Sequence, residues 1–111
     1  MTVSIKQLIA AQQIAGSATT YYTATRVTAR VDTFTLTNTD TAAQTVTVYL
    51  IASGGSASAT NTIISAKSIQ PGECYVAAEM IGKTVPSGSF IQALCSTAAK
   101  VTIEASGIEV T

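Results

Sequence analysis

The chain of 111 residues contains no histidine and no tryptophan, and only 11% of its residues are charged. The absence of histidine removes the commonest general base and the commonest zinc ligand in proteins. It also excludes the usual Ser-His-Asp and Cys-His catalytic arrangements. Two cysteines without histidine cannot form an ordinary four-ligand structural zinc site. We therefore expect no metal and no cofactor.

An excess of one charge sign is also lacking. Six Lys and Arg residues balance six Asp and Glu residues, so no net positive field is available to hold a nucleic-acid backbone. No apolar run approaches the roughly 18 to 20 residues that a membrane-crossing helix needs. The apolar stretch near the N-terminus is broken by Gln12 and Gln13, and it is too polar for a signal-peptide core. We expect this stretch to belong to the mature protein, and we expect neither a nucleic-acid nor a membrane partner.

The six carboxylates are the one remaining basis for an enzyme, because two of them at a suitable separation can hydrolyse a glycosidic bond. Asp40 and Glu73 fall in predicted turns, and Glu104 and Glu109 alternate with apolar neighbours as outward strand residues do. The aromatic residues that would line a sugar site are limited to two Phe and four Tyr. We therefore predict that the protein is not an enzyme.

Small residues are abundant, with 19 Thr, 18 Ala and 11 Ser. Threonine favours strands over helices because its branched Cβ is stiff and fits a pleated surface. Polar and apolar residues alternate with the strand period of two over residues 45–50 and 101–105. Between residues 26 and 37 the alternation changes phase near Asp32, which either a β-bulge or burial of both faces would explain. Gly107 shifts the phase again near the C-terminus.

Turn sequences separate these strand-like segments. Residues 70–73, Gln-Pro-Gly-Glu, have the order that a type II turn requires, and residues 86–89 form a second turn of related composition. Turns that recur every roughly 8 to 15 residues favour a β-sandwich over βαβ units. We predict one domain, residues 1–111, folded as an antiparallel β-sandwich of about seven to eight strands. Residues 1–20 are an N-terminal arm or edge segment, and the pattern of residues 5–14 leaves helix and strand open.

Cys74 and Cys95 lie in two strand-like segments whose apolar faces match. If residues 74–78 and 91–95 pair as an antiparallel hairpin closed through residues 82–88, Cys74 lies opposite Cys95. Cβ atoms at such positions are roughly 4.5 to 5.5 Å apart, whereas a disulfide usually needs about 3.5 to 4.5 Å. This cross-strand cysteine pair therefore permits a disulfide without requiring one. Without an export signal, we expect two buried, reduced cysteines that pack as small hydrophobic residues.

One short segment combines aromatic and basic residues. Tyr21 and Tyr22 lie close to Arg26 and Arg30, a combination that can stack on single-stranded nucleic acid. Adjacent tyrosines in a strand face opposite sides, however, and Asp32 offsets the two arginines. We favour one tyrosine in the core and one at an interface.

The low charge of the surface predicts association. Monomeric proteins normally keep a charged surface, and strand proteins with uncovered edges tend to associate edge to edge. We expect the edges and the flat Thr/Ala faces to be covered by other subunits, most simply in a symmetric homo-oligomer. The candidate interface residues are the four tyrosines, a residue type that interfaces favour: Tyr21, Tyr22, Tyr49 and Tyr75.

A series of short segments runs in a definite order along nearly the whole chain. It begins with residues 5–8 and 22–24. It continues with Thr-Leu-Thr-Asn-Thr at residues 35–39, Thr-Val-Thr-Val-Tyr-Leu at residues 45–50 and Ser-Gly-Gly at residues 53–55. Residues 61–68, the Pro-Gly-Glu turn at 71–73, and residues 81–85, 90–94 and 106–109 follow. In this order the segments resemble a set of small structural proteins of tailed bacteriophages.

The resemblance implies a β-sandwich component of the virion. Such a component is a capsid decoration or cement protein, or a neck or tail accessory protein, and the resemblance implies no functional residues. Its partners would be copies of itself and other virion proteins, namely the major capsid, neck or tail proteins. Assembly in the cytoplasm of the host bacterium would agree with reduced cysteines. A carbohydrate-binding virion module is the alternative, and it would require an aromatic-lined cleft.

Overall fold

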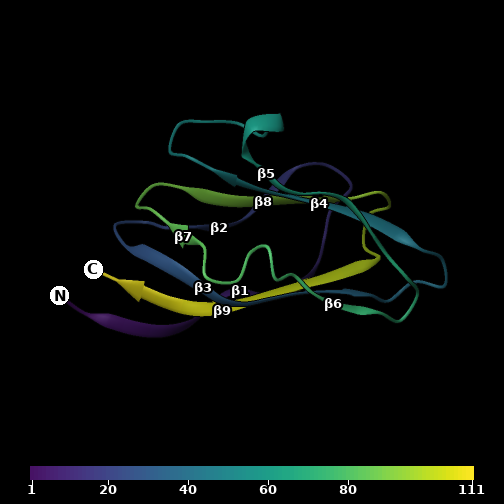
Figure 1. The fold of residues 1–111 in the computed structure, drawn as a ribbon, viewed down its shortest axis with the longest axis horizontal. Helices are drawn as coiled ribbons and strands as arrows, with labels where there is room; N and C mark the ends of the chain where they lie inside the picture. Colours follow the sequence, from purple (N-terminus) through teal and green to yellow (C-terminus); the bar gives the residue numbers. More distant parts are fainter.

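The computed structural model describes all residues, 1–111, as an all-β protein without an α-helix (Figure 1). Its strands are β1 (Val3–Gln13), β2 (Thr19–Thr23), β3 (Thr28–Asn38), β4 (Gln44–Ile51), β5 (Thr62–Ile69), β6 (Cys74–Val76), β7 (Thr84–Val85), β8 (Phe90–Cys95) and β9 (Val101–Val110). One 3-10 turn, η1 (Ala59–Asn61), lies in the loop between β4 and β5. None of the structure's helical segments has the length and apolar character needed to cross a membrane.

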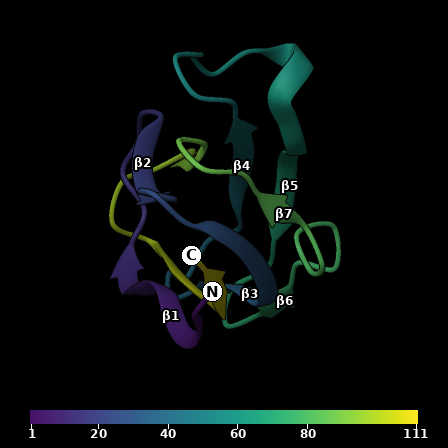
Figure 2. The same cartoon turned by 90° about the vertical axis from the view of Figure 1, so that its left-hand side faces the viewer.

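The strands form two antiparallel sheets that pack face to face, as the end view in Figure 2 shows. The first sheet has the order β1-β9-β3-β6, with β7 also paired to β3, and the second sheet has the order β2-β8-β4-β5. Only β4 and β5 are neighbours both in the sequence and in a sheet. Both termini lie at one end of the sandwich, where Val3 of β1 pairs with Val110 of β9.

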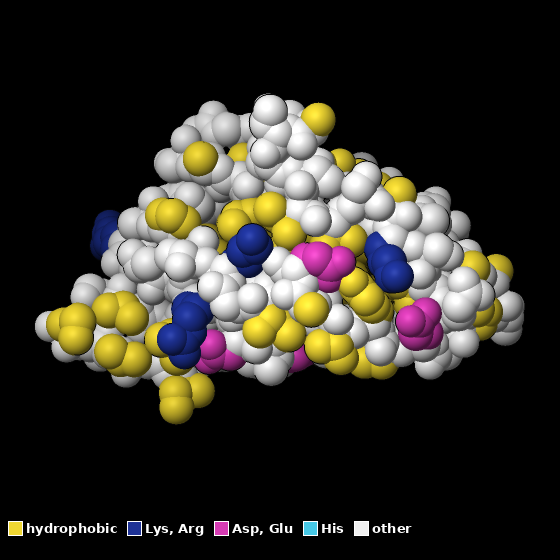
Figure 3. Space-filling model, in the orientation of Figure 1, with side chains coloured by type: hydrophobic (Ala, Val, Ile, Leu, Met, Phe, Trp, Pro, Cys, Tyr) yellow, Lys and Arg dark blue, Asp and Glu magenta, His cyan; other side chains and the backbone are white.

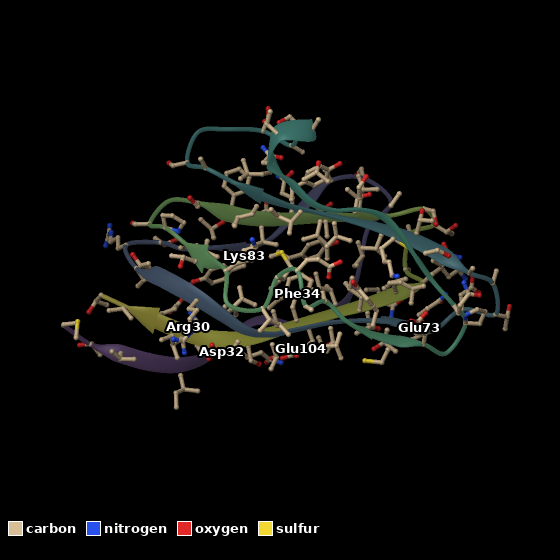
Figure 4. All side chains as sticks on the ribbon, viewed as in Figure 1. Arg30, Asp32, Phe34, Glu73, Lys83 and Glu104 are labelled. Carbon is tan, nitrogen blue, oxygen red and sulfur yellow. The ribbon has the colours of Figure 1, made fainter.

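The core lies between the sheets and is filled by alternate residues of the strands. In β3, for example, Val31, Phe34 and Leu36 are fully buried, and Phe34 points into the space between the sheets (Figure 4). The cluster of 22 buried hydrophobic residues is continuous and draws on both sheets. Because buried apolar surface contributes roughly 25 cal/mol per Å², this shared cluster stabilises the two sheets together.

Two β-bulges in the first sheet lie beside the same glycine. The pairing of β3 with β9 slips by one residue at Asp32, and the pairing of β1 with β9 slips at Leu8. Gly107 of β9 pairs with Lys6 of β1 and with Val31 of β3, so it lies next to the bulge at Asp32 and close to the bulge at Leu8. A Cβ at this position would lie 1.9 Å from the carbonyl oxygen of Arg30, so no residue larger than glycine fits without moving the backbone.

Several expectations from the sequence are confirmed. The fold is an antiparallel β-sandwich, with nine strands where about seven to eight were expected. The phase change at Asp32 is a bulge. Gly72 has a φ of 76°, and the N–H of Glu73 donates to the carbonyl oxygen of Gln70 at 3.0 Å, as a type II turn requires. The segment around residues 5–14, which was open between helix and strand, forms most of β1, an edge strand.

The predicted hairpin between residues 74–78 and 91–95 is wrong. β6, which contains Cys74, pairs with β3 in the first sheet, whereas β8, which contains Cys95, pairs with β2 and β4 in the second. The cross-strand cysteine pair therefore does not form, and both cysteines are free. Cys95 is buried, as expected, but the expectation of burial is wrong for Cys74, which lies on the edge strand β6 and is exposed. The prediction relied on the match between the apolar faces of the two segments. Every strand that borders the core has the same alternation, so alternation alone does not identify a strand's partner.

Candidate interaction surface

The structure shows no pocket that could enclose a ligand, and no three His, Cys, Asp or Glu side chains lie together where they could hold a metal ion. Every buried side-chain nitrogen or oxygen has a hydrogen-bond partner. The features that remain for recognition of a partner are the flat outer faces of the sheets and their free edges.

The outer face of the second sheet carries no charged side chain. Strands β2, β4 and β8 contain no Lys, Arg, Asp or Glu, and the one charged residue of β5, Lys67, lies over the ring of Tyr75 from the first sheet. Outward positions follow from their alternation with the buried residues Val46, Val48 and Ala93. We call this surface the neutral face, and it consists of Thr20, Thr23, Thr45, Thr47, Tyr49, Thr62, Phe90, Gln92 and Leu94.

The larger side chains of the neutral face come from its two central strands. The pairing of β4 with β8 sets Thr47 opposite Leu94 and Tyr49 opposite Gln92. The loop that contains η1 covers one end of the face, where Ile51 is fully buried outside the main core. In Figure 3 no dark blue or magenta side chain appears along the upper rim of the molecule, where Figure 1 places η1. The result is a surface without a pocket that presents apolar and hydroxyl groups and no charge.

The outer face of the first sheet differs in charge. Arg30 and Asp32 form an ion pair there at 2.9 Å, and Glu104 accepts hydrogen bonds from Gln7 at 3.1 Å and from Ser106 at 2.8 Å. Figure 4 shows Arg30, Asp32 and Glu104 along this sheet. Since the centres of interfaces are depleted of charged residues, the neutral face is the better candidate for a contact that excludes water.

The free edge of β1 is the second uncovered feature. β1 pairs only with β9, and two of its apolar side chains are exposed, Ile5 to 94% and Val3 to 55%. Ile5 lies opposite Ile108 of β9, and Val3 lies opposite Val110. Figure 3 shows hydrophobic side chains gathered at the left of the molecule, where Figure 1 places the two termini.

Of the four tyrosines predicted for an interface, only Tyr49 lies on the neutral face. Tyr22 is buried, and its hydroxyl donates across the sandwich to Glu109. Burial of the hydroxyl, together with the neighbouring Glu109 carboxylate, raises the pKa of Tyr22. The hydroxyl of Tyr21 accepts the backbone N–H of Ala15 at 2.8 Å. Tyr21 and Tyr22 therefore use their hydroxyl groups within the chain.

Tyr75 belongs to a small cluster that joins edge strands of the two sheets. Its hydroxyl donates to the carboxylate of Glu79, at 2.6 and 2.7 Å from the two oxygens, and Nζ of Lys67 lies 4.9 Å from its ring centroid. The Glu79 carboxylate raises the pKa of Tyr75 to about 12, and the same hydrogen bond lowers the pKa of Glu79. Tyr49 is thus the one tyrosine whose hydroxyl has no partner within the chain.

A titration of tyrosine absorbance with pH tests the Tyr75 cluster. Because the pKa of Tyr75 is raised to about 12, its hydrogen bond stabilises the fold fully below the ordinary value of 10 and is lost as the pH rises through about 12. We expect the absorbance change near pH 12 to shrink in Tyr75→Phe and to move toward lower pH in Glu79→Gln. The loss of unfolding free energy should stay below about 1 kcal/mol, because the Glu79 carboxylate is exposed to solvent and Tyr75 is only partly buried. An unaltered titration curve for Glu79→Gln would contradict the assignment.

The structure does not assemble the aromatic and basic patch that the sequence places at residues 21–30. The ring of Tyr22 is buried and cannot stack on a base, and the guanidinium of Arg30 is bound to Asp32. The carboxylates are likewise engaged one by one: Asp40 accepts a hydrogen bond from Gln44 at 2.8 Å and lies 3.9 Å from Nζ of Lys100. These contacts fix turns and strand ends.

Sequence reasoning missed three residues that now stand out, namely Phe90 and Leu94 of the neutral face and Ile5 of the β1 edge. A signal for the neutral face was present, because residues 44–51 and 90–95 contain no charged residue in either phase of their alternation. The exposed position of Ile5 was not predicted because the bulge at Leu8 shifts the alternation of polar and apolar residues within β1.

No protein-family model, no curated protein and no solved structure matches the chain.

Proposed function

We propose that the chain is a non-enzymatic structural subunit of a tailed-phage virion, a decoration or cement protein that binds the assembled capsid lattice through the neutral face. The observation that carries this proposal is the absence of charged side chains from β2, β4 and β8, the strands that form most of that face. The resemblance of many short segments to small phage structural proteins supplies the setting. The absence of a pocket on this surface supports a protein–protein contact over the capture of a small ligand.

The neutral face is suited to a contact between proteins. Interface centres are rich in aromatic residues and poor in charges, and Tyr49, Phe90 and Leu94 provide apolar surface among threonine hydroxyls. Each Å² of apolar surface removed from water contributes roughly 25 cal/mol. Because no ion has to leave water, binding avoids a desolvation penalty of several kcal/mol per charge.

A lattice also makes a modest contact sufficient. Each attached copy raises the effective concentration of the next contact when copies are linked to one another or to several lattice sites. The partners in this proposal are therefore the major capsid protein and further copies of the chain. A neck or tail lattice would present the same kind of repeated surface.

Co-sedimentation with assembled heads that lack this protein tests the proposal. Thr45→Lys places a charge on the neutral face, and the matched Thr33→Lys places the same charge at an exposed outer position of the first sheet. We expect the wild type and Thr33→Lys to sediment with the heads. Thr45→Lys should bind at least about tenfold more weakly, because an unpaired charge buried at an interface costs more than about 1.4 kcal/mol.

Two results would count against the proposal. Equal binding by the two lysine variants would place the contact away from the neutral face. A wild-type chain that sediments with neither heads, necks nor tails would overturn the structural function itself.

A further inference from the structure

We infer that two copies of the chain pair edge to edge through β1, antiparallel about a two-fold axis at Ile5, and so form one continuous sheet across both molecules. This inference goes beyond the proposed function, because it concerns a different surface and requires no lattice. Four observations carry it: the free backbone groups of β1, the irregularity of the other edges, a row of isoleucines, and the placement of the one nearby charge.

The outer backbone groups of β1 have no partner strand. The N–H of Thr111 donates to the carbonyl oxygen of Thr2 at 3.0 Å, which fixes the phase of the β1–β9 ladder. Hydrogen bonding alternates along an antiparallel strand, so the even-numbered residues of this stretch bond to β9. The odd-numbered residues from Val3 to Gln7 therefore direct their N–H and C=O groups to the free edge. Such a row of unpaired groups is a template for another strand.

The other edges of the sandwich are short or irregular. β6 has three residues and β7 has two. The pairing of β2 slips between Thr20 and Tyr22, and the pairing of β5 with β4 slips at two points. β1 has eleven residues, and its pairing with β9 is regular from Val3 to Gln7. It is the one edge that offers a straight segment long enough for several hydrogen bonds.

The side chains of β1 select a second copy of the chain as the partner strand. Ile5 already lies opposite Ile108 of β9 on the outer face, and it is 94% exposed. A two-fold axis at Ile5 sets it opposite Ile5 of the second copy and aligns four isoleucines in one row across four strands. Apolar side chains directly opposite each other on one face stabilise a strand pair. The row is self-complementary, as an isologous interface must be.

Charge agrees with this register. Lys6 is the only charged residue from Val3 to Gln7, and its Nζ lies 3.3 Å from Oε1 of Glu109 in the same chain. With the axis at Ile5, Lys6 lies opposite Ser4 of the second copy, so no like charges meet. An axis one residue further along would bring the two Lys6 side chains together, which is destabilising.

Light scattering over a range of concentrations tests the pairing. We expect the mass of the wild type to double as concentration rises. Ile5→Pro should keep the mass of a monomer at all concentrations, because it removes an N–H that faces the free edge and leaves the bonds to β9 intact. Ile5→Lys should do the same, whereas Ile81→Lys, at an exposed apolar position elsewhere, should dimerise like the wild type. Circular dichroism confirms that each variant is folded.

Cross-linking tests the register. In a Cys74→Ser background, Ile5→Cys should give an oxidised covalent dimer, because Cα atoms of a hydrogen-bonded pair are about 5.5 Å apart and a disulfide fits that distance. Gln7→Cys lies opposite Val3 of the second copy and should not cross-link. Cross-linking through position 7 in place of position 5 would overturn the pairing at Ile5.

Two further outcomes would overturn the inference: a wild type that stays monomeric at every concentration, or a dimer that survives in both Ile5→Pro and Ile5→Lys. The proposed function fails separately. Ile5→Lys leaves the neutral face unchanged and should still sediment with heads, so loss of the dimer and loss of lattice binding are distinct results.

Discussion

Replacement of Gly107 by alanine is expected to lower the free energy of unfolding by about 3 to 5 kcal/mol, a large part of the roughly 5 to 15 kcal/mol that stabilises a typical domain. A Cβ at this position would lie 1.9 Å from the carbonyl oxygen of Arg30 and 3.1 Å from Cδ1 of Leu8. The nearer contact is with backbone, which cannot rotate away as a side chain can. Relief of the clash would separate β3 from β9 at the centre of the first sheet.

Gly16→Ala is the matched control. A Cβ there would meet the Cβ of Ala98 at 3.7 Å, an ordinary van der Waals distance. Unfolding in urea should therefore show a change within about 0.5 kcal/mol for Gly16→Ala and a much lower midpoint for Gly107→Ala. Equal midpoints for the two variants would contradict the close approach of the Arg30 carbonyl oxygen to Gly107.

Asn38→Ala is expected to cost about 2 to 4 kcal/mol, since removal of one partner leaves buried polar groups unsatisfied. Asn38 is fully buried, and its Nδ2 donates to the carbonyl oxygens of Ala42 and Ile69, both at 2.9 Å. Its Oδ1 accepts the N–H of Asp40 at 2.8 Å. Asn38 ends β3 and Ile69 ends β5, so this side chain joins the first sheet to the second.

Asn61→Ala removes an asparagine with similar bonds in an exposed setting. Nδ2 of Asn61 donates to the carbonyl oxygen of Ser56, and Oδ1 accepts the N–H of Ser58. Water can replace these partners, so the loss of unfolding free energy should be below about 1 kcal/mol. If Asn38→Ala costs no more than Asn61→Ala in the same urea experiment, the buried bonds do not tie the sheets together.

The sequence predicts the strands of this fold better than their partners. Alternation located β4 and β9 because each has one face in the core, and the phase change located the bulge at Asp32. The predicted pairing of residues 74–78 with 91–95 was wrong because strand order depends on long-range packing that alternation does not encode. The edge strand β1 stayed ambiguous because only Leu8 and Ile9 of its eleven residues are buried.

The candidate surface was predictable only in part. Residue preference pointed to tyrosine, but Tyr22 and Tyr75 are held by Glu109 and Glu79 within the chain, which a preference for interfaces does not anticipate. Most of the neutral face comes from β2, β4 and β8, which lie in separate parts of the sequence. The sequence shows that these strands lack charged residues, but only the sheet order shows that they lie side by side and form one uncharged surface.

The central claim is that the protein attaches to a lattice through an uncharged sheet face. The salt dependence of its binding to assembled heads tests this claim most directly. Between about 0.1 M and about 1 M NaCl the screening length falls from about 10 Å to about 3 Å. Binding through the neutral face should then change by less than about twofold, because no charge pair forms across the contact. A loss of affinity of about tenfold or more over this range, or no binding at either salt concentration, would contradict the claim.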